Sequence, residues 1–137
     1  MRPKPHSWLE QLSDCSNGRE QEITLMEGDD HINVRSSEHG VLLCVQLTRD
    51  CPDPRSLGTW LRIGQSSLLH FAGALAQAPA CGRLWLLQHL PHTCSQAEVL
   101  ATLEALLNQR DTWRRVAKRL VMPASKLYVT SLRSLPN

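Results

Sequence analysis

The chain has few aromatic residues and no long apolar run. Aromatic side chains make up only 4% of its 137 residues, so leucine and valine must fill most of the core that the 42% apolar content allows. No apolar run approaches the roughly 20 residues of a membrane-spanning helix. Glu10 also excludes a signal-peptide core after the first residues. We therefore expect one cytoplasmic domain over residues 1–137, with its core at about 7–120 and a flexible tail at 123–137.

The cysteines do not form a disulfide framework or a zinc motif. Their number is odd and no CxxC pair occurs, which indicates a reducing compartment. His89, His92 and Cys94 form an HxxHxC string, but a zinc site needs a fourth ligand and a second shell of hydrogen bonds. We interpret these three as ordinary loop and strand residues and predict no bound metal.

Sequence motifs of enzymes are also missing. There is no G-x-S-x-G elbow, phosphate-binding loop, dinucleotide fingerprint or HExxH helix. His31, His39 and His70 read as surface or half-buried residues of strands and loops. We expect no enzymatic activity and no cofactor, with a hydrolase that uses an unrecognised Cys or Ser nucleophile as the hypothesis left open.

The first half of the chain predicts a helix followed by an antiparallel meander. Ser7 and Glu10 have capping-box spacing for a short helix over 7–13. Apolar residues then alternate around Ile23 and Ile32, with turn residues between them. The nearly continuous apolar run 41–47 indicates a strand that is central or covered on both faces.

The second half predicts a middle helix, one or two strands and a long final helix. Apolar residues recur at helical spacing from Arg55, whereas the segment 71–78 fits either a helix or a strand. Residues 83–90 alternate as a strand whose two faces are both largely apolar. Ser95 and Glu98 open the strongest helix, which we expect Pro123 to stop. The order is that of an α+β fold.

Charge gathers in two places. Glu27, Asp29 and Asp30 form an acidic turn, which we interpret as a solvated hairpin tip. The final helix carries a basic run, in which the first arginine interrupts an otherwise apolar stripe. The run comprises Arg110, Arg114, Arg115, Lys118 and Arg119. Nucleic-acid binding by this run is an alternative function, although a net charge of +2 does not by itself predict it.

The strongest functional indication is surplus apolar surface. The middle helix and strands that are apolar on both faces offer more apolar area than one small core requires. Self-association or capture of another chain would cover this excess. Protein binding is therefore the function that the residues favour.

Several local strings, in this order and spacing, resemble the class I type III secretion chaperones. They are the segments Trp60–Gly64, Phe71–Ala76 and Gly82–Pro91 and the helix that opens at Ser95, over about residues 7–120. The resemblance implies a strand at about 70–76. It also implies an antiparallel twisted sheet of about five strands with three helices, in the order helix-strand-strand-strand-helix-strand-strand-helix.

The resemblance further implies a homodimer and a mode of action. The dimer would form on the middle helix, through Leu57, Trp60, Leu61 and Leu68. The family holds a non-globular segment of a secretion substrate against apolar patches. Carried over by position, these patches involve Trp8, Leu12, Ile23, Leu25, Ile32 and Val34. Nucleic acid and membrane are not expected partners.

Two departures from the family concern charge. Effector chaperones of this class are usually acidic, whereas this chain is slightly basic and its final helix is rich in arginine. In both respects the chain is more similar to the HrpG-type chaperone-like regulators of plant-pathogen Hrp secretion systems, which bind a regulatory partner. We therefore favour a partner that controls type III secretion genes over the N-terminal segment of a secreted virulence protein.

Overall fold

The computed structural model describes residues 21–134, and of Gln21 and residues 121–134 it describes the backbone. Within this range the elements are β1 (Gln21–Glu27), β2 (Asp30–Ser37), β3 (Gly40–Gln46), α2 (Pro54–Ser67), β4 (Ala74–Gln77), β5 (Leu84–Leu90) and α3 (Gln96–Ser134). The predicted first helix, 7–13, lies outside the described residues. The described part thus contains two of the three expected helices, and the α+β class is confirmed.

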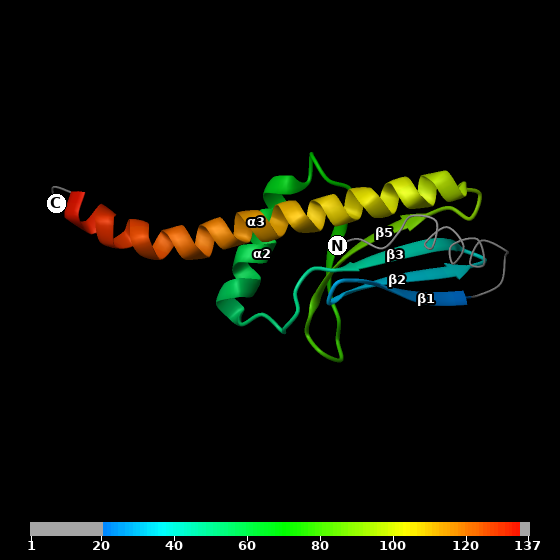
Figure 1. Cartoon of the computed structure of the whole chain (residues 1–137), viewed down its shortest axis with the longest axis horizontal. Coiled ribbons are helices and arrows are strands. Elements are labelled where there is room, and N and C mark those ends of the chain that lie inside the picture. Colours follow the sequence, from blue (N-terminus) through cyan, green and yellow to red (C-terminus); the bar gives the residue numbers. More distant parts are fainter. Residues whose placement is uncertain (1–20, 135–137) are drawn as a thin grey trace.

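The five strands form one antiparallel sheet in the order β1-β2-β3-β5-β4. The first three form the predicted meander, and β3 lies at the centre because it pairs with both β2 and β5. The segment that fitted either a helix or a strand forms β4, which pairs with β5 at the sheet edge. Figure 1 shows α3 running along the sheet and crossing α2.

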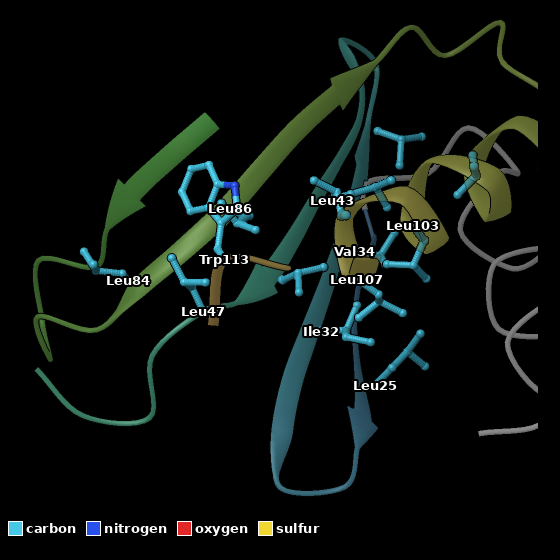
Figure 2. Packing of buried hydrophobic residues seen from close by; sticks show 14 of the residues in the cluster. Leu25, Ile32, Val34, Leu43, Leu47, Leu84, Leu86, Leu103, Leu107 and Trp113 are labelled. Carbon is cyan, nitrogen blue, oxygen red and sulfur yellow. The ribbon is translucent and has the colours of Figure 1, made fainter. Parts of the chain in front are cut away.

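The core lies between one face of the sheet and α3. Alternate strand residues point into it, because successive side chains of a strand face opposite sides. Figure 2 shows Leu103, Leu107 and Trp113 of α3 facing this layer of strand residues. The buried strand side chains there are Leu25, Ile32, Val34, Val41, Leu43, Val45, Leu84 and Leu86. The predicted stripe of α3 is therefore the core face of that helix as far as Ala117, whereas Leu120, its last member, is 50% exposed.

Helix α2 packs on α3 at a close crossing. A Cβ built on Gly64 would lie 3.3 Å from the Trp113 ring, so the small residue lets the two helices approach. Asp53 caps the start of α2, where its Oδ1 accepts a 2.7 Å hydrogen bond from the Ser56 amide. That backbone hydrogen bond lowers the pKa of the Asp53 carboxyl.

The final helix is longer than we predicted. Ser95 caps it as expected, with its Oγ accepting from the Glu98 amide at 3.1 Å. The helix then continues to Ser134, so the prediction that Pro123 stops it is wrong. A proline removes one amide donor, and a long helix with many other backbone bonds can continue past that loss. Figure 1 shows the C-terminal part of α3 extending past α2.

Candidate functional site

Two regions of the described chain depart from the usual placement of side chains. At the β1–β2 turn, charged residues are buried. Around α2, large apolar residues are exposed. The first region explains how the fold is held, and the second offers a surface to another molecule.

The buried charges belong to the acidic turn and to α3. Glu27 and Asp30 are only 8% and 4% exposed, and Arg110 of α3 is 4% exposed. The Arg110 guanidinium donates to Glu27 and, at 2.8 Å, to Asp111, and lies 3.7 Å from Asp30. We call Glu27, Asp30, Arg110 and Arg114 the charge cluster. Because Glu27 and Asp30 are buried in this cluster, the prediction of a solvated hairpin tip is wrong for these two carboxylates.

Asp30 is the acceptor at the centre of the charge cluster. Arg114 donates to its two oxygens at 2.8 and 3.0 Å, and Arg49 donates to Oδ1 at 3.2 Å. Burial alone would raise the pKa of Asp30, but the hydrogen bonds from Arg114 and Arg49 outweigh it and lower the pKa to about 2. Asp30 is therefore ionised in the fold at neutral pH and orients both guanidinium groups.

The charge cluster joins three parts of the chain. Arg114 also donates to the Leu47 carbonyl at 2.9 Å, so one side chain of α3 holds both the β1–β2 turn and the end of β3. For Arg110, burial would lower the pKa, yet the hydrogen bonds from its guanidinium to Glu27 and Asp111 raise it overall. This geometry fixes α3 along the sheet, which explains why an arginine interrupts its apolar stripe.

The same contacts reduce the basic surface that was considered for nucleic acid. Arg110 and Arg114 are engaged within the chain. Arg115, Lys118 and Arg119 remain exposed on α3. Three neighbouring cations give a smaller footprint than the basic run suggested from the sequence alone.

Among the described side chains, three of the five exposed large apolar residues lie on α2 or directly after it, and the other two are Met26 of β1 and Leu120 of α3. Leu61 is 55% exposed, Leu68 75% and Leu69 94%. Leu61 and Leu68 are seven residues apart, and the backbone at Leu68 is still helical, so these two share one face. We call Leu61, Leu68 and Leu69 the α2 leucine surface. Water contacts these large side chains in the isolated chain, which is a common property of binding surfaces.

The predicted dimer residues divide between the core and this surface. Leu57 and Trp60 are half-buried and pack against the core, whereas Leu61 and Leu68 are exposed as an interface would require. Their role in a dimer stays a prediction. Leu69 is not among the predicted dimer residues, although the sequence places it near the same helical spacing, and it lies directly after the helix as the most exposed of these leucines.

The residues predicted to hold a partner lie elsewhere. Ile32 and Val34 are fully buried and Leu25 is 5% exposed, all beneath α3, while Ile23 is half-buried at the core margin. Their contact with a partner stays a prediction, and the structure gives their side chains a role in the core. The other two predicted residues, Trp8 and Leu12, lie outside the described residues.

A groove of about 740 Å³ lies between the loop that follows β3 and the two helices. Cys51, Asp53 and Trp60 line one side, and Arg114 and Lys118 of α3 line the other. Its walls combine apolar and charged groups. The groove therefore adjoins both the charge cluster and the start of α2.

Among the described side chains, no three His, Cys, Asp or Glu residues are arranged to hold a metal ion. His89 lies in β5 beside Gly40, and Cys94 is half-buried before α3. Burial raises the pKa of the Cys94 thiol. Neither described helix has both the length and the apolar character needed to cross a membrane.

Comparison with known proteins gives a likeness of fold. No family model and no curated protein match the chain. A chain in the structure of the HopA1–SchA chaperone–effector complex is 16% identical, with a TM-score of 0.55 over 82% of this chain and 99% of that one. A chain of the heterodimeric ExoU–SpcU complex from the type III secretion system of Pseudomonas aeruginosa is 22% identical. Its TM-score is 0.54, over 88% of this chain and 99% of that one. The chain therefore has a fold that occurs in type III secretion chaperone–effector complexes.

Proposed function

We propose that this chain acts by binding, as a type III secretion chaperone-like protein that sequesters a partner protein in the cytoplasm. The observation that carries the proposal is the α2 leucine surface, with Leu61, Leu68 and Leu69 from 55% to 94% exposed. The fold supports the same conclusion, because the two similar structures are complexes of a chaperone or its counterpart with another protein. Covering exposed leucines with a partner removes apolar area from water, which is the main driving force of such association.

Within this proposal, the partner is a regulator of type III secretion genes. The support is charge: the chain carries a net charge of +2, and Arg115, Lys118 and Arg119 stay exposed on α3, the helix on which α2 packs. An acidic regulator would be attracted to such a surface. The alternative within the same function is a dedicated effector chaperone, which would hold the N-terminal segment of a secreted protein.

A homodimer built on α2 is the competing use of the same leucines, because a second copy and a partner cannot cover one surface at the same time. Leu61 and Leu68 lie on one helix face, and a two-fold axis near that face would bring the same residues of two copies together. Light scattering on the purified chain tests this, since a monomeric mass at micromolar concentration would contradict the dimer.

The experiment that tests the function is a pull-down of the tagged chain from its native host, with the recovered proteins identified by mass spectrometry. The matched variant is Leu61→Ser/Leu68→Ser/Leu69→Ser, and the control is Met26→Ser, because Met26 is an exposed apolar residue of β1. We expect a secretion regulator with the wild type and the control, and its loss with the triple variant.

Other outcomes of this experiment have defined meanings. Recovery of a secreted protein through its N-terminal segment would make the chain an effector chaperone and contradict the regulator. Loss of the partner with Met26→Ser, but not with the triple variant, would move the binding surface to the meander. Recovery of no secretion protein with the wild type would contradict the proposed function as a whole.

A further inference from the structure

Two exposed thiols lie on loops that meet beside the groove. Cys51 belongs to the loop between β3 and α2, and Cys81 belongs to the turn between β4 and β5. The other two described cysteines differ, because Cys44 is buried and Cys94 is half-buried, and burial raises the pKa of both thiols. Among the described cysteines, Cys51 and Cys81 are thus the two that an oxidant in solution reaches most readily.

The side chain of Cys51 rests directly on the residue that follows Cys81. A Cβ built on Gly82 would overlap Cys51 Sγ and would lie 3.1 Å from Cys51 Cβ. Gly82 has φ +75°, a backbone conformation that suits glycine, so this residue permits both the turn and the close approach. The contact joins two loops that are about thirty residues apart in the chain.

Hydrogen bonds hold the turn in this position. The Gly82 amide donates to the Ala78 carbonyl at 2.8 Å, and Gln77 Nε2 donates to the Gly82 carbonyl at 3.0 Å. Because consecutive Cα atoms are about 3.8 Å apart and each Cα–Cβ bond adds about 1.5 Å, Cys81 Cα lies within roughly 10 Å of Cys51 Cα. A disulfide spans a Cα–Cα distance of up to about 7 Å, so a movement of this exposed turn by at most about 3 Å brings the two cysteines into bonding range.

We propose that Cys51 and Cys81 are a modification site, at which a reversible intramolecular disulfide ties the β4–β5 turn to the loop that leads into α2. The inference rests on the contact between these two loops and does not depend on the proposed function. A disulfide between two exposed cysteines is expected to form and break as the ratio of disulfide to thiol in solution changes, in contrast to a buried structural disulfide.

The chemistry is thiol–disulfide exchange with oxidised glutathione. The thiolate of one cysteine attacks a sulfur of oxidised glutathione, which forms a mixed disulfide and releases one glutathione thiolate. The second cysteine thiolate attacks the protein sulfur of the mixed disulfide and releases the other glutathione. Each released thiolate takes up one proton. The two protein thiols are oxidised to one disulfide, and one oxidised glutathione is reduced to two glutathione molecules.

The bond would stiffen one wall of the groove. Cys51 lines the groove together with Trp60 of α2 and Lys118 of α3. Linking Cys51 to the β4–β5 turn would restrict the loop that ends at the helix cap Asp53. The oxidised chain would therefore present the start of α2 in a narrower range of positions than the reduced chain does.

The test is to incubate the reduced full-length chain with mixtures of oxidised and reduced glutathione, then block remaining thiols and digest without reductant. We expect one cross-linked peptide pair that joins Cys51 to Cys81, with a mass lower by two hydrogens and reversed by dithiothreitol. Cys51→Ser and Cys81→Ser should each abolish it. Cys44→Ser and Cys94→Ser, the matched controls, should leave it intact.

Three results would overturn the proposal. They are glutathione adducts on Cys51 and Cys81 without a bond between them, a bond from either residue to another cysteine, and a bond between two chains. The same oxidation in concentrated urea is the second control, because the native contact is lost there. The yield of the Cys51–Cys81 pair should fall in urea, and an unchanged yield would show that the fold does not direct the bond.

Discussion

The charge cluster and the α2 leucine surface are opposites in composition and in exposure. At the β1–β2 turn, Glu27, Asp30 and Arg110 are each less than a tenth exposed, although charged groups prefer water. At α2, Leu68 and Leu69 are at least three-quarters exposed, although leucine prefers the core. The chain thus keeps charges inside and apolar side chains outside at two separate places.

The comparison separates what holds this fold from what is available to a partner. Buried ion pairs contribute little net stability, but removing one partner is costly, so they fix one arrangement of helix and sheet. Exposed leucines contribute little to the stability of the isolated chain. Variants in the charge cluster should therefore change unfolding, whereas variants in the α2 leucine surface should change binding.

The largest effect on unfolding is expected for Arg110→Met. The change removes the guanidinium that pairs with the buried Glu27 carboxylate, and such a loss typically costs about 3–5 kcal/mol. Urea unfolding followed by circular dichroism measures the free energy. The control is Arg115→Met, an exposed arginine on the same helix, which should stay within about 0.5 kcal/mol of the wild type.

A double variant decides whether charge or packing causes that loss. Glu27→Leu/Arg110→Met replaces both partners with apolar side chains, which should recover most of the stability. If the double variant is as unstable as the single one, the charge cluster does not hold the fold in the way described.

A smaller effect is expected where α3 holds the loop before β4. Gln109 is buried, and its side-chain amide pairs with both the amide and the carbonyl of Gly73. In Gly73→Ala, the new Cβ would lie 2.5 Å from Gln109 Oε1 and 2.6 Å from Leu106 Cδ2. We expect a loss of roughly 1–3 kcal/mol in the free energy of unfolding.

The matched control for Gly73→Ala is Gly58→Ala. Gly58 is inside α2, and a Cβ there has nothing within 4 Å. Alanine favours a helix interior over glycine, so this variant should gain about 0.5–1 kcal/mol. Equal losses for both alanines would contradict the close approach at Gly73.

The charge cluster also predicts a dependence of stability on pH. The pKa of Asp30 falls from the ordinary 3.8 to about 2 in the fold, so its ionised form stabilises the fold. That contribution is present above pH 3.8 and is lost as the pH falls through about 2. Its size is on the order of 2 kcal/mol.

Unfolding in urea at a series of acidic pH values measures this contribution. Asp30→Asn should be less stable than the wild type at neutral pH and should lose less on acidification. Asp29→Asn, at an exposed position of the same turn, should follow the wild-type curve. If the free energy of unfolding falls as steeply with acidic pH in Asp30→Asn as in the wild type, Asp30 is not the titrating group.

The smallest effect on unfolding is expected at the α2 leucine surface. Leu68→Ser/Leu69→Ser replaces two side chains that are 75% and 94% exposed, so the free energy of unfolding should change by less than about 0.5 kcal/mol. A loss comparable to that of Arg110→Met would show that these leucines belong to the core.

The sequence predicted the strands of the sheet more fully than it predicted the contacts between distant side chains. Alternation around Ile23 and Ile32 predicted two strands, and the continuous run 41–47 predicted the central one, because burial on one or both faces leaves a direct mark on residue order. The spacing of α3 likewise predicted its core face. Strand β4, which pairs with β5, was expected only from the family resemblance, since its alanines fit a helix equally well.

The charge cluster could not be predicted, because its members are far apart in the chain. Glu27 and Arg110 are 83 residues apart, and a turn of acidic residues most often lies in water. One signal was present: Arg110 interrupts an apolar stripe, and a buried cation requires an anion. On α2, Trp60 packs against the core and Leu61 is exposed. Which of the two faces inward depends on how α2 crosses α3, and residue spacing alone does not predict that crossing.

The most direct test of the central claim is to titrate the recovered secretion partner against the wild type and Leu68→Ser/Leu69→Ser by calorimetry. Exposed leucines that become buried in a complex should cost at least about tenfold in affinity when replaced. We predict that loss together with an unchanged unfolding midpoint. Equal affinity of the two proteins would contradict the assignment of the α2 leucine surface to partner binding.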